Sequence, residues 1–597
     1  MSDTLISRRD LDFLLWEWLQ LDAILTQPEY AAHDRETVDA VLDLSAQVAE
    51  DLFLPHFKAC DQDEPRIDAE GNVRVHPSIG PVLREYAGLG LFGMSFKEEL
   101  GGMYLPQTAV TASQAYFMAA NVAIAAYPML TAGNARVIAA FGTPKQVDAF
   151  ALPQIAGTDL GTMCLSEPQA GSGLADVRTR AEPDGADEYG GRYRLSGNKM
   201  WISGGDQDIT RNIIHLVLAK IPGEDGRLSD GTKAISLFIV PKWLPGDERN
   251  DVSVAGLNHK MGYRGTSNCL LNFGEGLHQP MGKAGAVGYL IGKGGDGLAL
   301  MFQMMNEARI AVGLGAAAIA YRGYRQAVRY AREREQGRAV DPAKAGGPVA
   351  IINHPDVQRM LLAQKVYSEG ALALVLYCSS LVDREHHDPD ATELLALLTP
   401  IAKSWPSEWG VAANDLAIQV HGGYGYTRDF DVEQLYRDNR LNPIHEGTTG
   451  IQGLDLLGRK VLRSNGRAMA LLGAKVADTV SRTNGNAHLA EFGESLVEAW
   501  SRLEATVDEL RGAPPERALA NATAFMFGFG HVVMAWLWLD QALACDPNAT
   551  GEDAAYYAGK VRACRFFFEC ELPKTRAWLS FAASLSDVAS GVPAEQF

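Results

Sequence analysis

The spacing of apolar residues changes along the chain and separates helical from strand-forming regions. Before about residue 157, segments such as "RETVDAVLDLSAQVAEDLF" and "QAYFMAANVAIAAYPMLTAGNARVIAAFG" repeat apolar residues every three or four positions, which is the spacing of a helix with one buried face. From about 158 to 284 the period shortens to two in "RYRLSGNKMWIS", "IIHLVLAK" and "AISLFIVPK", and Gly, Asp and Pro clusters separate these predicted strands. Helical spacing returns from 285 and continues to the end of the chain.

This pattern predicts a mainly α protein with an all-β insert. A chain of 597 residues is longer than one hydrophobic core supports, so several domains are expected. We predict an N-terminal helical domain at 1–157, a β-domain at 158–284, a C-terminal helical bundle at 285–465 and an additional helical domain at 466–597.

Two apolar stretches raise the question of a membrane. Residues 518–539, "ALANATAFMFGFGHVVMAWLWL", are numerous enough to span a bilayer. Because Asn521, Thr523 and His531 interrupt this stretch, we predict a buried core helix and no integral membrane segment. The apolar run near the N-terminus is short and is interrupted by Glu17, so it predicts an amphipathic helix and not a signal peptide.

Composition argues against two classes of site. A net charge of −19 disfavours nucleic-acid binding, which needs many cations to neutralise phosphates, but a few local Arg or Lys residues could still bind a small anion. The seven cysteines are scattered, with no CxxC and no metal-ligand spacing, which indicates a reduced cytoplasmic compartment and no metal site.

The segment "GKGGDG", residues 292–297, matches the GxGxxG pattern of dinucleotide-binding folds. That fold also needs a βαβ unit and an acidic residue at the end of its next strand, whereas one long predicted helix follows here. We therefore interpret the segment as a flexible lead into that helix.

A single carboxylate stands at a loop-to-helix junction in "RDNRLNPIHEGTTGIQG", residues 437–453. Pro443 disfavours helix just before itself, and apolar residues at helical spacing follow, so Glu446 is expected near a helix start. Free amides at a helix N-terminus favour an anion there. Taken alone, this residue is better explained as a helix-capping Glu than as a catalytic group.

Other glycine-rich segments alter that interpretation. "MCLSEPQAGSG", residues 163–173, "KMWISGG", residues 199–205, and "QVHGGYGYTRD", residues 419–429, each offer backbone, hydroxyl or aromatic groups to a ligand. Each alone could be a turn, and Trp201 alone could be a core aromatic. Together, in this order and with Glu446 downstream, they resemble the acyl-CoA dehydrogenases over about residues 40–465. The tail resembles the extra domain of larger bacterial members, including the long-chain fatty acyl-CoA and methylthiopropionyl-CoA dehydrogenases.

The resemblance implies FAD as the cofactor, bound between the β-domain and the bundle. Ser166 and the backbone of Met163 and Leu165 are expected to hydrogen-bond the flavin ring. Trp201 is expected to pack against that ring, and Ser203 to lie near its N5 atom. The remaining expected FAD contacts are Thr448, Gly450 and Ser172. Ser172 is also expected to touch the thioester.

The resemblance also implies a homodimer, with a tetramer as the alternative. Arg334 corresponds to an arginine that reaches the FAD of the neighbouring subunit, and Gln419, Gly422 and Gly423 correspond to the segment that receives the partner's adenosine diphosphate. The expected substrate contacts are Asn306 and Arg309 on the CoA side and Ser172, His445 and Gly447 at the thioester. The plain alternatives are a surface charge partner for Arg334 and a structural helix arginine for Arg309.

Three positions depart from the family pattern. His445 stands where tyrosine is frequent, which alters the lining of the thioester pocket. Residues 336–338, "QGR", replace a frequent Lys-Thr-Phe-Gly run, which puts the reach of Arg334 in doubt. Gly450 replaces a polar side chain, so only its backbone could contact the cofactor.

By this resemblance, Glu446 is the general base that takes the α-proton of an acyl-CoA while hydride passes to the flavin. A minority of the family carries the base on the long helix, where this chain has Ala308, and Glu307 lies one residue too early, about 100° around the helix. Glu167, next to Pro168, is interpreted as structural.

The expected activity is acyl-CoA dehydrogenation in fatty acid β-oxidation, on medium to long chains, with electrons passed to an electron-transfer flavoprotein. The alternatives are an acyl-CoA oxidase, a methylthiopropionyl-CoA dehydrogenase or a non-catalytic acyl-CoA-binding scaffold. Chain length depends on the depth of a cavity and is not readable from the sequence.

Overall fold

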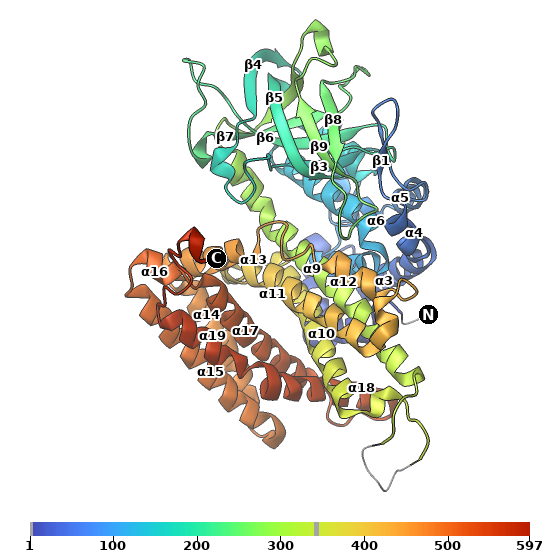
Figure 1. Ribbon diagram of the computed structural model, residues 1–597, viewed down its shortest axis with the longest axis vertical. Coiled ribbons are helices and arrows are strands. Elements are labelled where there is room, and N and C mark those ends of the chain that lie inside the picture. Colours follow the sequence, from blue (N-terminus) through green and yellow to red (C-terminus); the bar gives the residue numbers. More distant parts are fainter. Residues whose placement is uncertain (1–3, 340–345) are drawn as a thin grey trace. The chain divides into compact units, whose positions relative to one another are not determined.

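The computed structural model (Figure 1) describes residues 4–339 and 346–597, apart from the side chains of 302–306 and 487. The chain forms two compact units. The first unit contains Met1–Asp34, Gln107–Ala115 and Arg309–Phe597, and the second contains Arg35–Pro106 and Tyr116–Ala308. The predicted fold class, helical with a central β-domain and an additional C-terminal helical domain, is confirmed.

The second unit contains a sheet of eight strands with helices before it in the chain. The strand order is β10-β7-β6-β4-β5-β9-β8, and β3 pairs in parallel with β6. Because β10 pairs with both β7 and β5, the strands from β10 to β5 close into a ring. The strands are β3 (Leu160–Cys164), β4 (Arg180–Asp187), β5 (Gly190–Ser203), β6 (Ile213–Lys220), β7 (Ile235–Pro241), β8 (Val252–Leu257), β9 (Asn268–Phe273) and β10 (Ala286–Ile291); a separate pair is β1 (Arg66–Ile67) with β2 (Val73–Arg74).

Every residue of β6 and β7 is buried, so these strands are covered on both faces. One face packs against Val137, Ile138 and Phe150 of the preceding helices. The helices of this unit are α3 (Arg35–Val48), α4 (Phe57–Gln62), α5 (Ile79–Gly88), most of α6 (Gln107–Phe141), α7 (Pro144–Gln146) and α8 (Leu152–Ile155).

The first unit is entirely helical apart from loops and an isolated bridge, among the residues described. Its N-terminal segment forms α1 (Arg8–Asp12) and α2 (Leu21–Leu25), and its longest helices are α9 (Gly297–Glu333, from Arg309 onwards), α10 (Pro355–Val382) and α11 (Pro389–His421). The remaining helices are α12 (Val432–Asn439), α13 (Thr449–Leu454), α14 (Arg467–Arg482), α15 (Ala487–Arg511), α16 (Pro515–Leu519), α17 (Ala522–Ala544), α18 (Gly551–Phe566) and α19 (Lys574–Ala583). Helices α14, α15, α17 and α19 lie side by side in Figure 1 and, together with α16 and α18, belong to the additional domain.

The N-terminal segment is joined to the C-terminal part of the same unit by buried charges. Lys560 of α18 forms ion pairs with Asp10 of α1 and with Glu369 of α10, the latter at 3.0 Å. The hydroxyls of Tyr321 and Tyr556 donate to the two oxygens of Asp10. The charges in this cluster therefore have partners without access to water.

Two of the described helices are long and apolar enough to cross a membrane, α6 with a mean hydropathy of 1.3 and α17 with 1.5. In each of them 83% of the most apolar window is buried inside the protein. Helix α17 covers most of the predicted core helix at 518–539, and its burial confirms that prediction. The stretch at 292–297 leads into a long helix as predicted, because α9 begins at Gly297, and the preceding β10 pairs antiparallel with its neighbours, unlike the strand of a dinucleotide-binding βαβ unit.

Candidate functional site

In the second unit, the loop after β3 is tied to the end of β5. The backbone amide of Met200 donates to the carbonyl of Ser166 at 3.0 Å, and the ammonium of Lys199 donates to the carbonyl of Leu165 at 3.0 Å. Met163 lies on β3 opposite Leu216 of β6. The predicted flavin-contacting backbone at 163–166 is thus fixed against two strands.

A buried ion pair beneath this loop holds it in place. Lys199 and Glu167 are 3.0 Å apart, and both side chains are buried. Glu167 also accepts from the hydroxyl of Thr179 at 2.6 Å and from the amide of Arg178 at 2.7 Å. Burial raises the pKa of Glu167, but the Lys199 charge and these hydrogen bonds outweigh it and hold the pKa below its ordinary value. Glu167 is therefore an ionised structural group, as the sequence indicated.

Trp201 is 58% exposed, so the interpretation of this residue as a core aromatic is wrong. The pairing of β5 with β9 changes register between Lys199 and Ile202, and Trp201 adopts a left-handed backbone with φ +66° in this bulge. The indole is presented on the surface of the β-domain in consequence.

Two serine hydroxyls belong to the same part of the β-domain sequence motifs as this indole. Ser203, two residues after the indole, accepts from the side-chain amide of Asn268 at 3.3 Å and is partly exposed. Ser172 lies on an exposed loop. A large exposed indole, with the Ser203 hydroxyl two residues further along β5, fits a flat heteroaromatic ring, and these residues are compatible with a flavin.

In the first unit, Glu446 lies in the loop between α12 and α13. Its backbone is left-handed, with φ +52°, and Gly447 follows with φ +91°. The N-cap of α13 is Thr448, whose hydroxyl accepts from the amide of Ile451 at 3.4 Å. Glu446 does not cap the helix, so that interpretation is wrong.

Hydrogen bonds fix the backbone on both sides of Glu446. The ammonium of Lys403, from the middle of α11, donates to the carbonyls of Asn442 and Gly447, both at 2.8 Å. The side-chain amide of Gln452 donates to the carbonyl of Glu446 itself at 3.0 Å. The base loop, residues 442–447, is therefore held from α11 and from α13.

The Glu446 carboxyl is partly exposed and lies near two cations. Burial raises its pKa above the ordinary value, and the charges of Lys403 and Arg309 oppose that rise without cancelling it. Burial lowers the pKa of His445 to about 3, so its imidazole is neutral, and its Nε2 lies 3.0 Å from Oδ1 of Asn442. His445 packs against the base loop as an uncharged group.

Arg309 is buried on α9 and forms an ion pair with Asp455 at 2.8 Å. Its Nε atom is buried with no hydrogen-bond partner among the described residues. One donor of this guanidinium thus remains for a ligand. The ion pair with Asp455 is also what a purely structural helix arginine would form. The side chain of Asn306 lies outside the described residues, and its role stays a prediction.

The predicted cofactor contacts to a neighbouring subunit share one exposed surface. The guanidinium of Arg334 lies over the ring of Tyr424 at 5.5 Å, and Gln419, Gly422 and Gly423 are exposed at the end of α11. Gly422 has φ +60°, a conformation that favours glycine. Gly450 is within α13, where only its backbone is available.

Sequence reasoning missed Lys403 and Glu408. Glu408 accepts from the hydroxyl of Thr449 and so ties α11 to the start of α13. The available signal for Lys403 was a lysine within the apolar run "LLTPIAKSW", because a buried ammonium needs a specific set of acceptors.

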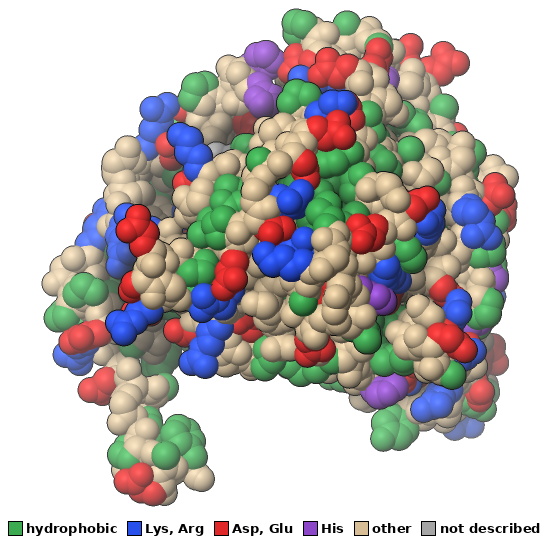
Figure 2. Space-filling view, turned by 90° about the horizontal axis from the view of Figure 1, so that it is seen from above, with side chains coloured by type: hydrophobic (Ala, Val, Ile, Leu, Met, Phe, Trp, Pro, Cys, Tyr) green, Lys and Arg blue, Asp and Glu red, His purple; other side chains and the backbone are tan. Residues whose placement is uncertain are grey.

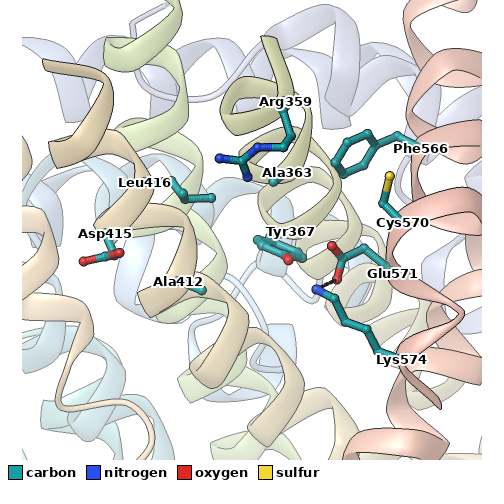
Figure 3. A pocket seen from close by; sticks show the side chains of 10 residues that line it. All are labelled: Arg359, Ala363, Tyr367, Ala412, Asp415, Leu416, Phe566, Cys570, Glu571 and Lys574. Carbon is teal, nitrogen blue, oxygen red and sulfur yellow. Dashed lines mark hydrogen bonds and ion pairs between the residues drawn. The ribbon is translucent and has the colours of Figure 1, made fainter. Parts of the chain in front are cut away.

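A separate cavity of about 350 Å³ lies between α10, α11 and the helices α18 and α19 (Figure 3). Tyr367 and Glu571 form its buried floor, and Lys574 pairs with Glu571 at 2.7 Å. None of the predicted site residues lines this cavity.

On the face drawn in Figure 2, acidic and basic side chains are interspersed.

Four family models match successive parts of the chain. Residues 35–158 match "Acyl-CoA dehydrogenase, N-terminal domain", and residues 162–275 match "Acyl-CoA dehydrogenase, middle domain". Residues 295–462 match "Acyl-CoA dehydrogenase, C-terminal domain", and residues 472–593 match "Acetyl-CoA dehydrogenase C-terminal like". The models thus cover both units and the additional domain.

Full-length relatives and solved structures agree with these models. A 3-methylmercaptopropionyl-CoA dehydrogenase of Ruegeria pomeroyi is 34% identical over 94% of both chains. A broad-specificity linear acyl-CoA dehydrogenase, FadE5, of Mycobacterium tuberculosis is 32% identical over 95% of both. The crystal structure of Caenorhabditis elegans ACDH-11 in complex with C11-CoA is 19% identical and matches 98% of this chain and 94% of its own with a TM-score of 0.76, which shows the shared fold.

A Bacillus anthracis acyl-CoA dehydrogenase complexed with FAD also has this fold, with a TM-score of 0.72 at 21% identity over 96% of this chain and 91% of its own. From the identity to full-length relatives and the successive family models, the chain belongs to the acyl-CoA dehydrogenase family, as an FAD-dependent acyl-CoA dehydrogenase with an additional C-terminal helical domain.

Proposed function

We propose that Glu446 is the general base of this dehydrogenase and removes the α-proton of the bound acyl-CoA thioester. The observation that carries the proposal is the base loop itself. Glu446 has a left-handed backbone in this loop, and its carboxylate lies near two cations. The residue that caps α13 is Thr448 and not Glu446. A structural carboxylate would gain nothing from this conformation, which costs energy for a residue with a side chain.

Two groups of Glu446 have separate roles in proton removal, its carboxylate and its backbone amide. The Glu446 carboxylate takes the α-proton, and its raised pKa makes it a stronger base once it is ionised. The Glu446 amide has no acceptor among the described residues, so it is available to the thioester carbonyl, where negative charge develops. Bound FAD would supply the acceptor for the β-hydrogen, which would leave the substrate as hydride and give a trans-2-enoyl thioester.

Residues of the second unit are proposed to bind and orient the flavin. Trp201, with its exposed indole, would pack against the ring face, and Ser203 would lie near the hydride-accepting atom. The backbone at 163–166 and the Ser166 hydroxyl would offer hydrogen bonds to the ring. On the other unit, Arg309 offers to the CoA side its buried Nε, which has no hydrogen-bond partner among the described residues. Ser172, Asn306, His445, Gly447, Thr448 and Gly450 keep the contact roles that the family resemblance implies.

We infer a linear acyl-CoA of medium to long chain as substrate and an electron-transfer flavoprotein as electron acceptor, within fatty acid β-oxidation. Support for a linear chain comes from the Mycobacterium tuberculosis relative, which is named for broad specificity towards linear acyl-CoA. The Ruegeria pomeroyi relative is named for 3-methylmercaptopropionyl-CoA, which makes a short thioether-bearing thioester the second candidate.

The test is Glu446→Gln. The variant should retain FAD and bind acyl-CoA, because the amide keeps the shape of the carboxylate. Flavin bleaching on anaerobic mixing with substrate should slow by about 10²- to 10⁴-fold, the usual contribution of a general base. Bleaching at the normal rate in a variant that binds substrate would show that Glu446 is not the base.

A matched control is Glu433→Gln on α12. Glu433 forms an i,i+4 pair with Arg437, so its loss should leave the bleaching rate unchanged. The same assay, run on acyl-CoAs from short to very long and on 3-methylmercaptopropionyl-CoA, separates the substrate candidates. Peroxide formation under air, in place of reoxidation by an electron-transfer flavoprotein, would identify an oxidase.

A further inference from the structure

Lys403 is a fully buried lysine in the middle of α11. Burying an ammonium is unfavourable unless it is hydrogen-bonded or paired. Its hydrogen bonds reach the carbonyls of Asn442 and Gly447, both at 2.8 Å, and no carboxylate of the described residues forms an ion pair with it. A buried positive charge that is held by neutral carbonyls retains its effect on nearby ionisable groups.

The two carbonyls lie on either side of Glu446 in the base loop. Glu446 and Gly447 both adopt left-handed backbone, with φ +52° and φ +91°. This conformation costs roughly 1–2 kcal/mol for a residue with a side chain, so it persists where the surroundings hold it. Lys403 anchors the loop before and after the base, and Gln452 anchors the carbonyl of the base residue itself.

The two other basic side chains around Glu446 carry little free positive charge. Arg309 on α9 is paired with Asp455 at 2.8 Å, and His445 on the loop is neutral. Glu408 on α11 accepts from the hydroxyl of Thr449, and its charge acts on Lys403 without forming an ion pair with it among the described residues. Lys403 is thus the cation near Glu446 whose charge no ion pair among the described residues offsets.

We propose that Lys403 is a positioning residue for the catalytic base: its ammonium holds the two carbonyls that flank Glu446 and places a positive charge near its carboxylate. The proposal rests on the proposed role of Glu446. It assigns a function to a residue of α11 that lies 43 positions before the base in the sequence.

The ionisation of the two groups supports this assignment. Burial lowers the pKa of Lys403 to about 8, and the charges of Glu446 and Glu408 limit that fall. Burial raises the pKa of Glu446, and the charge of Lys403 opposes the rise. Lys403 is therefore cationic below about pH 8, where it favours the ionised and active form of the base, and it loses this effect at higher pH.

The test compares pH profiles of anaerobic flavin bleaching for wild type and Lys403→Met. Without the positive charge, Glu446 should ionise at higher pH, so the acid limb of the profile should move to higher pH. The rate near pH 6 should fall roughly ten-fold, and the deficit should shrink towards pH 8. The wild-type inflection near pH 8 should be absent from the variant.

Lys403→Gln is the second variant, because its amide can still donate to a carbonyl but carries no charge. It keeps the test decisive if the methionine variant does not fold, and it should show the same shift of the acid limb. Lys365→Met is the control. Lys365 is a lysine of α10 that pairs with Glu369, and Glu369 keeps Lys560 at 3.0 Å when Lys365 is lost. This control should lower the melting temperature without moving the pH profile.

A folded Lys403 variant with the wild-type pH profile would overturn the proposal. A lower melting temperature or lower FAD content with an unmoved acid limb would do the same, because it would show a purely structural lysine. These outcomes are distinct from failure of the proposed function. If Glu446→Gln bleaches normally, the base assignment fails, whereas an inactive Glu446→Gln with an unshifted Lys403→Met overturns only the role of Lys403.

Discussion

The residues with the most unusual backbone in this protein include two that carry proposed chemistry. Trp201 and Glu446 both have positive φ, +66° and +52°, although neither is glycine. In Trp201 the cause is a bulge in β5, and in Glu446 it is a loop anchored by Lys403 and Gln452. In both cases the strained backbone places the side chain where a regular strand or helix would not.

Gly447 is the residue that makes the base loop possible, which gives a prediction. It has φ +91°, and a Cβ there would lie 2.6 Å from Nε2 of Gln452, the group that anchors the Glu446 carbonyl. Gly447→Ala should therefore displace the base and slow flavin bleaching by about ten-fold or more, while FAD stays bound.

The matched control for Gly447→Ala is Gly485→Ala. Gly485 has nearly the same φ, +92°, but a Cβ there meets nothing within 4 Å. Both variants should lower the melting temperature through backbone strain, and only the first should slow bleaching. Equal bleaching rates in the two variants would show that the base loop tolerates the change.

Among single residues, those within a sequence motif could be predicted as site residues. Those that contact the base loop from a different helix could not. Glu446 and Trp201 could be singled out because their neighbours in the chain are informative. Lys403 could not, because its two acceptors are 39 and 44 residues away and are brought to it only by the packing of α11 against the base loop.

Among the elements, the strands and long helices follow from apolar spacing, and their irregularities do not. The predicted strand "IIHLVLAK" is β6, and "RYRLSGNKMWIS" ends at the last residue of β5. The N-terminal segment, predicted to be an amphipathic helix, is helical as α1 and the π-helix Phe13–Trp18 that continues it, and it breaks at Gln20, with φ +53°, before α2. Four consecutive residues of this segment are buried, namely Phe13, Leu14, Leu15 and Trp16, so the segment does not have the single apolar face of an amphipathic helix.

The start of α6 depends on a carboxylate from another helix, and this supplies a prediction of pH dependence. Asp383, at the end of α10, accepts from the amides of Gln107 at 2.5 Å and Thr108 at 3.0 Å. Burial raises the pKa of Asp383 from 3.8 to about 6, and these hydrogen bonds limit the rise. The folded protein therefore binds this proton more tightly than the unfolded chain does.

The sign of the effect follows from that difference. Protonation of Asp383 stabilises the folded state fully below about pH 3.8, and the stabilisation is lost as the pH rises through about 6. Asp383→Asn mimics the protonated form at every pH. The melting temperature of wild type minus that of Asp383→Asn should consequently fall between about pH 4 and pH 7, as measured by calorimetry. A constant difference over this range would contradict the assignment.

At the scale of the whole molecule, the additional C-terminal domain is part of the same compact unit as the bundle that carries the base. Helix α18 of that domain supplies Lys560, which pairs with Asp10 near the N-terminus and with Glu369 of the bundle. The order of domains along the sequence could be predicted from changes of period. The joining of the first 34 residues to this unit could not, because it depends on contacts between residues as much as 546 positions apart.

The proposed homodimer gives the last prediction, through Arg334. Arg334 lies on the same exposed surface as Gln419, Gly422 and Gly423, and the family resemblance directs this surface to the FAD of a partner subunit. Arg334→Met alone should therefore weaken FAD binding, and Glu446→Gln alone should be inactive. The two variants, produced together with different affinity tags, can form a mixed dimer.

In the mixed dimer, the subunit that carries Arg334→Met keeps its own Glu446 and receives Arg334 from its partner, so one site is intact. Activity should then recover to about a quarter of wild type in a random mixture, because half of the dimers are mixed and each has one working site. If Arg334 instead acts on the FAD of its own subunit, no site in the mixed dimer is intact and activity stays at the level of the single variants. In dimers isolated by both tags, all of which are mixed, the recovery should reach about half of wild type. This measurement tests the dimer and the reach of Arg334 at once, because a monomer could not complement.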